Sequence, residues 1–170
     1  MEPDQILDID VDIANEGNTE LIWSMEITFP DVAESDPWEL LHTIEAGEIL
    51  EDSRLYSAIF IDDHYYIGKG VRNGDNLIYV LNLDGEVVRQ FTQEGESSFG
   101  YRDMAWDGEL IWAYVDEMIY GFHTNGELER SFESPLSPMR GITWDQDNQH
   151  LWICSTHSDL YAVDLDGDIL

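Results

Sequence analysis

A repeat of 41 residues is the feature that most constrains this chain of 170 residues. Tyrosines stand at positions 79, 120 and 161 and glycines at positions 85, 126 and 167, so every step is 41 residues. Phe91 and Phe132 lie at the same interval. Self-similarity at a fixed period of this length is the signature of a repeat architecture. We therefore interpret most of the chain as copies of one small structural unit.

Each unit predicts four short strands. In the copy that is best defined, the apolar runs cover residues 101–107, 110–115, 118–124 and 127–132. The Asn125-Gly126 turn between the last two runs is a strong hairpin signal. Two units open alike, with Met104-Ala105-Trp106-Asp107 and Ile142-Thr143-Trp144-Asp145, and Ile61-Asp62 begins a weaker third copy. Four antiparallel strands in 41 residues fit a propeller blade better than a sandwich.

The last unit carries a known blade pattern. Its Arg140-Gly141-Ile142-Thr143-Trp144-Asp145 run is followed by Leu151-Trp152, Leu160-Tyr161 and Asp164-Leu165-Asp166-Gly167. This succession resembles the NHL and YVTN-like family of bacterial β-propellers, and the resemblance covers residues 55–170. It implies a propeller fold without fixing an activity, since the family includes hydrolases, lyases and binding scaffolds. The WD40 pattern differs, because its Gly-His pair is absent and the Trp-Asp pair ends the first strand here.

The first 29 residues predict a β-hairpin that belongs to another module. Apolar residues alternate from Leu7 to Ile13 and again from Leu21 to Ile27, with the turn residues Asn15-Glu16-Gly17-Asn18 between them. The run 13–24 resembles a segment near the end of immunoglobulin-like modules in bacterial surface proteins. We predict a partial immunoglobulin-like module over 1–29, a linker over 30–37, and a partial β-propeller over 38–170.

Residues 38–46 fit two structures, a short helix or the outer strand of a blade that begins upstream. We expect the outer strand, because residues 40–44 align with the segment that ends in Phe91. About three blades are present, whereas a closed propeller needs about four or more. The chain is therefore expected to be a piece of a longer protein, with self-association of several copies as the alternative.

The charge excludes several classes of partner. With 37 acidic against seven basic residues, the net charge is −30, which opposes binding to nucleic acid and to anionic membranes. Three explanations for the acidity stay open: solubility, adaptation to high salt, and calcium binding. Asp164-Leu165-Asp166-Gly167-Asp168 is similar to the start of a calcium loop, but the equivalent stretches of the other units are ordinary hairpin turns. We predict no cofactor, with calcium as the alternative. No signal peptide or membrane-spanning run is predicted.

Two arginines are the main candidates for ligand binding. In propellers of this type, the loops between blades and the loops between second and third strands gather at one end of the central channel. Arg102 and Arg140 each stand four residues before a repeat tryptophan, at the same entry to an innermost strand. Guanidinium groups suit carboxylates, so both are predicted to contact an anionic or sugar ligand, with Tyr101, Asp116 and His157 as further candidates. The alternative is that each arginine pairs with a nearby acid such as Asp103.

The sequence predicts binding rather than catalysis. The five histidines lack metal-binding spacing, and no G-x-S-x-G motif occurs, so no metal or catalytic residue is predicted. We expect a non-catalytic, secreted or cell-surface recognition module for a carbohydrate, peptide or protein. The alternatives are a fragment of a propeller hydrolase or cyclotransferase with its active site in the central channel, and a spacer without a ligand. The apolar innermost strands argue against the enzyme.

Overall fold

The computed structural model describes residues 39–70, 75–157 and 159–170. Residues 42–170 form one compact unit. The predicted immunoglobulin-like hairpin over 1–29 and the linker over 30–37 lie outside the described residues. Within the described ranges, no helix has the length and apolar character needed to cross a membrane.

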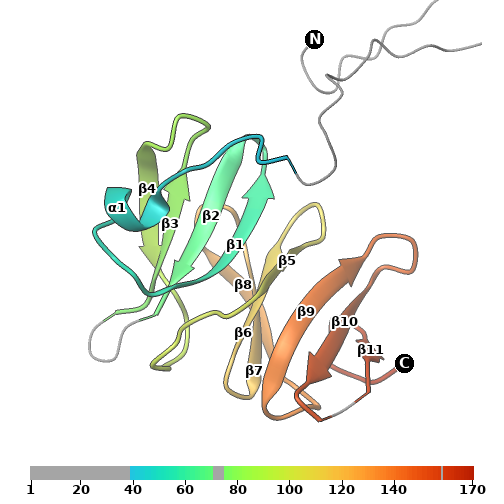
Figure 1. Ribbon diagram of the computed structural model, residues 1–170. Coiled ribbons are helices and arrows are strands. Elements are labelled where there is room, and N and C mark those ends of the chain that lie inside the picture. The colour runs from blue at the N-terminus through green and yellow to red at the C-terminus, as the bar shows by residue number, and fades with distance from the viewer. Residues whose placement is uncertain (1–38, 71–74, 158) are drawn as a thin grey trace, which may run out of the picture. The chain divides into compact units, whose positions relative to one another are not determined.

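Three antiparallel sheets follow one another along the chain (Figure 1). Blade 1 consists of β1 (Leu55–Ile61), β2 (His64–Lys69), β3 (Leu77–Leu81) and β4 (Val87–Thr92). Blade 2 consists of β5 (Met104–Trp106), β6 (Ile111–Val115), β7 (Met118–Phe122) and β8 (Leu128–Glu133). Blade 3 consists of β9 (Met139–Asp145), β10 (His150–Ser155) and β11 (Tyr161–Val163), and an isolated bridge from Val163 to Ile169 stands where its fourth strand begins. Strands adjacent in sequence are adjacent in each sheet, which is the order within a propeller blade.

Blade 2 is covered on both faces. All five residues of β6 are buried, because alternate side chains of a strand point to opposite faces and both faces have a neighbour. Ile111, Ala113 and Val115 belong to the cluster shared with blade 1. Trp112 and Tyr114 belong to the cluster shared with blade 3. The first strands form a row in which β5 contacts both β1 and β9, as the innermost strands of a propeller do.

The aspartate of the repeated Trp-Asp pair builds the turn between the first two strands of a blade. In blade 2, Asp107 Oδ1 accepts hydrogen bonds from the backbone N–H groups of Glu109 and Leu110. Asp107 Oδ2 accepts a third bond from the indole Nε1 of Trp112 at 2.6 Å. One carboxylate thus shapes the turn and fixes the tryptophan of the next strand, which explains why these residue types recur together.

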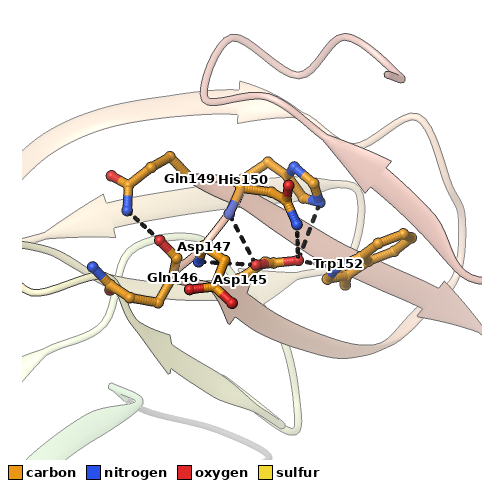
Figure 2. A network of polar contacts seen from close by, with 7 residues as sticks. Asp145, Gln146, Asp147, Gln149, His150 and Trp152 are labelled. Carbon is orange, nitrogen blue, oxygen red and sulfur yellow. Dashed lines mark hydrogen bonds and ion pairs between the residues drawn. The ribbon is translucent and has the colours of Figure 1, made fainter.

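Figure 2 shows the equivalent network in blade 3. Asp145 accepts hydrogen bonds from the backbone N–H groups of Asp147 and Asn148 and, at 3.0 Å, from Trp152 Nε1. His150 Nε2 lies 3.8 Å from the same carboxylate. The hydrogen bond from the Asn148 side chain, followed by that from Trp152, lowers the pKa of the Asp145 carboxyl.

This lowered pKa predicts a pH-dependent effect of Asp145→Asn. Ionised Asp145 contributes stability above the ordinary aspartate pKa of about 3.9, and this contribution is lost as the pH falls through the lower pKa of the folded state. In thermal unfolding, Asp145→Asn should therefore lower Tm at pH 7, and the Tm of the variant should approach that of the parent protein as the pH falls towards 2. Asp147→Asn is the control, since it removes the same charge but none of the carboxylate's bonds. Equal shifts for both variants at every pH would contradict the network.

The repeated glycine lies beneath an apolar side chain of the preceding blade. Gly126 has φ 93°, and a Cβ atom there would stand 2.6 Å from the Phe91 ring. Gly167 also has φ 93°, and its Cβ would stand 2.7 Å from Phe132. Only glycine combines a positive φ with so close a contact, so this contact accounts for the period of the glycines and phenylalanines.

The predicted outer strand over 38–46 is wrong. Residues 39–45 have no regular structure, and α1 (Ala46–Ile49) follows them. A strand needs a pairing partner, and the described residues before β1 contain no strand of an upstream blade with which it could pair. The alignment with Phe91 nevertheless has a structural counterpart. Ile44 lies 3.3 Å from the Cβ position of Gly85, the place that Phe91 takes over Gly126.

Candidate functional site

A cavity of about 210 Å³ lies where three segments of blades 2 and 3 meet. The segments are the loop from β4 to β5, the end of β6 with its turn, and the start of β9. We call it the arginine cavity, and its lining includes Phe99, Arg102, Tyr114, Asp116, Pro138 and Arg140. The structure therefore brings three of the five candidate residues, Arg102, Arg140 and Asp116, to one cavity.

Neither arginine at the cavity forms an ion pair with a carboxylate in the described part of the chain. The Arg102 Cζ lies 4.0 Å from the centre of the Phe99 ring, which places a flat guanidinium on an aromatic face. Arg140 Nη1 donates a hydrogen bond of 2.8 Å to the backbone oxygen of Met139. Since a guanidinium carries five N–H donors, both groups keep donors for another partner.

Asp103 was the alternative partner for these arginines, and its carboxylate binds backbone instead. Asp103 Oδ1 accepts a hydrogen bond from the N–H of Met104. Asp103 Oδ2 accepts one of 3.0 Å from the N–H of Ile142 in the next blade. This side chain therefore joins blades 2 and 3 and leaves the two guanidinium groups unpaired.

Tyr114 adds a buried hydroxyl group to the wall of the cavity. The residue is 3% exposed, and its hydroxyl has no hydrogen-bond partner among the described residues. Burial raises the pKa of the hydroxyl to about 12, so it remains protonated and able to donate at neutral pH. Buried polar groups nearly always have a partner, which makes this hydroxyl a candidate ligand contact. Sequence patterns could not find it, because Tyr114 stands within the apolar run of β6.

Tyr101 and His157 lie away from the arginine cavity. Tyr101 is 1% exposed, its hydroxyl accepts a hydrogen bond from the N–H of Glu94, and burial raises its pKa. Its own N–H donates to Gln93 Oε1. These bonds hold the loop before β5, which explains why the strand begins at Met104 rather than at the predicted Tyr101. His157 is exposed in the loop between β10 and β11 and does not line this cavity.

A second cavity, of about 500 Å³, adjoins the first. We call it the acidic cavity, because Glu96, Asp116 and Glu117 line it. It shares Val115, Asp116 and Pro138 with the arginine cavity. Asp116 has φ 52° in the turn between β6 and β7, a conformation in which aspartate and asparagine are enriched among non-glycine residues.

The structure also describes the stretch that is similar to a calcium loop. Asp164 Oδ1 accepts hydrogen bonds from the N–H groups of Asp166 and Asp168. Asn82 forms the same turn in blade 1. No group of three or more His, Cys, Asp or Glu residues within 39–70, 75–157 and 159–170 is placed to hold a metal ion. The expectation of no cofactor, with calcium as the alternative, stays a prediction.

Comparison with known proteins identifies the fold. No family model and no curated protein matches the sequence. The WD40 repeats of RRP9 match with a TM-score of 0.55 and 12% identity, over 69% of this chain and 37% of that one. The Neurospora crassa Pan2 WD40 domain matches with a TM-score of 0.51 and 13% identity, over 68% of this chain and 34% of that domain. A protein of unknown function from Bacteroides caccae matches with a TM-score of 0.54 and 15% identity, over 68% of this chain and 44% of that protein.

The chain thus spans less than half the length of each of these structures. At such low identity the likeness shows the fold and does not distinguish one propeller family from another. The described residues form a nearly all-β, partial β-propeller.

Proposed function

We propose that this chain is a non-catalytic recognition module that binds a peptide segment of a partner protein, with a carboxylate of that segment in the arginine cavity. The observation that carries the proposal is a pair of arginines around one cavity, neither of which forms an ion pair with a carboxylate of the described residues. The described residues include many carboxylates with which a surface arginine could pair. Two unpaired guanidinium groups at one cavity fit a site whose carboxylate comes from the ligand.

The arrangement supports such binding mainly through the two guanidinium groups. Phe99 supports the Arg102 guanidinium on one face and leaves its N–H edge free for a forked contact. Hydrogen bonds to charged groups contribute about 1.5–3 kcal/mol each. The Tyr114 hydroxyl is closed to solvent, so it would gain a partner, and lose the cost of about 1–3 kcal/mol for an unsatisfied buried group, only with a shift of the cavity wall.

The partner class and the location are parts of the same proposal. A carboxylate-bearing peptide suits the guanidinium pair better than a neutral sugar, so the carbohydrate is the alternative. The resemblance of residues 13–24 to modules of surface proteins supports an extracellular or cell-surface location. The remaining blades of a closed ring would come from a longer parent chain or from a second copy.

A charge-matched pair of double variants tests the proposal. Binding is measured by calorimetry against capped peptides that contain a single Glu or, as the reference, Gln. Arg102→Met with Arg140→Met is expected to weaken binding of the Glu peptides at least ten-fold, because it removes both guanidinium groups. Arg89→Met with Arg130→Met is the control, since these exposed arginines of β4 and β8 lie outside the cavity. Equal affinities for the two double variants would refute the proposal.

A further inference from the structure

We infer that the ligand is a dipolar peptide segment, which places a carboxylate beside Arg102 and Arg140 and a Lys or Arg side chain in the acidic cavity. The inference rests on the proposed function, because it extends the same site and names the chemistry of its ligand. It is carried by the juxtaposition of the two cavities and by the sign of the charges that line each of them.

The two cavities are neighbours with a common wall. Val115, Asp116 and Pro138 line both of them. A peptide that enters the arginine cavity therefore lies within reach of the acidic cavity. The common wall also offers apolar surface from Val115 and Pro138, on which the aliphatic stem of a Lys or Arg side chain can pack while its charged end reaches the acids.

Opposite charges face the arginine cavity without pairing with each other. Asp116 lines the same cavity as both arginines, yet it forms no ion pair with either of them in the described structure. A simple anion at the guanidinium groups would meet repulsion from Asp116, Glu96 and Glu117. A ligand that also carries a positive charge replaces this repulsion with attraction, so charge complementarity favours a dipolar ligand.

A second observation separates this site from an ordinary solvated acidic surface. The Tyr114 side chain lines the arginine cavity, is 3% exposed, and has a hydroxyl without a partner among the described residues. Because that hydroxyl is closed to solvent, an acceptor oxygen from a ligand would reach it only with a shift of the cavity wall. Ser137 Oγ, from the adjoining wall, donates a hydrogen bond of 3.0 Å to Glu117 Oε1 and holds one acid of the acidic cavity in place.

Eight capped peptides, four sequences in two orders, test the inference on the full chain. They are Gly-Glu-Ala-Lys-Gly and the versions in which Gln replaces Glu, Met replaces Lys, or both changes are made, each also in the reverse order. Affinities are measured by NMR titration. The Glu-Lys peptide is expected to bind about ten-fold more tightly than either singly neutralised peptide, because each part-exposed charge contact contributes a modest factor.

Variants that remove charges from the acidic cavity test whether this cavity causes the preference for Lys. Asp116→Asn with Glu117→Gln should strongly reduce that preference, since only Glu96 keeps its charge, and should keep the preference for Glu. Asparagine suits the positive φ at position 116, and glutamine retains an acceptor for Ser137. The control is Asp62→Asn with Glu109→Gln, which changes one acid at φ 46° and another exposed acid, both outside the two cavities.

The outcomes separate this inference from the proposed function. A Glu preference that needs the arginines, together with a Lys preference that needs Asp116 and Glu117, supports both. A Glu preference without any Lys preference overturns the dipolar ligand and leaves the proposed function standing. Peptide affinities that do not change in the Arg102→Met, Arg140→Met double variant, or no binding of any peptide, overturn both.

Discussion

Trp112→Ala is expected to lower the free energy of unfolding by about 3–5 kcal/mol. The side chain is fully buried in the cluster between blades 2 and 3. The centre of its ring lies 6.0 Å from the centre of the Phe132 ring, and its indole N–H donates a hydrogen bond of 2.6 Å to Asp107. Alanine would leave a large cavity at the centre of the blade and remove one of the three bonds to that carboxylate. Urea unfolding measures the loss.

Two further variants divide the Trp112 effect into its causes. Trp112→Phe keeps an aromatic ring but loses the N–H donor, so its cost is expected to be about 1–3 kcal/mol. Trp152→Ala is the matched control, because Trp152 binds Asp145 in the same way but is only partly buried. A cost for Trp152→Ala equal to that for Trp112→Ala would contradict burial between two blades as the main cause.

Gly126→Ala is expected to cost about 2–4 kcal/mol, the second large effect. The left-handed backbone at φ 93° accounts for about 1–2 kcal/mol in a residue with a Cβ atom. The remainder comes from the Phe91 ring, which lies 2.6 Å from the Cβ position and has to move. The substitution therefore tests the contact that joins neighbouring blades at the period of the repeat.

Gly108 supplies the control for the backbone part of this effect. It has φ 103° but nothing lies within 4 Å of its Cβ position. Gly108→Ala should therefore cost only about 1–2 kcal/mol. In a Phe91→Ala background, the cost of Gly126→Ala should fall to that level, because the overlapping ring is gone. If Gly126→Ala costs the same with and without Phe91, the contact does not explain the repeated glycine.

The repeat made the propeller fold predictable, because its signals arise within each blade. Alternation along a strand, Asn-Gly turns and the Trp-Asp pair are local features, and each unit shows them independently. The segment before β1 was not predictable in this way. Residues 40–44 carry the apolar pattern of an outer strand, but forming one depends on a pairing partner that the local pattern does not reveal.

The site was predictable only where the repeat fixes a position. Arg102 and Arg140 occupy equivalent places in two units, and the structure brings both to one cavity. Tyr114 was missed, because a tyrosine in an apolar strand looks the same whether its hydroxyl has a partner or not. Tyr101 was also a candidate, but its hydroxyl binds the backbone of its own loop.

The central claim is that Arg102 and Arg140 together receive a carboxylate from the ligand. The chain has only six arginines, so the Nε–Hε signals in an NMR spectrum of the ¹⁵N-labelled protein can be assigned from single Arg→Met variants. We predict that titration with the capped Gly-Glu-Ala-Lys-Gly peptide shifts the signals of Arg102 and Arg140 and leaves those of Arg89 and Arg130 in place. Shifts confined to other arginines, or no shift at saturating peptide, would contradict the account.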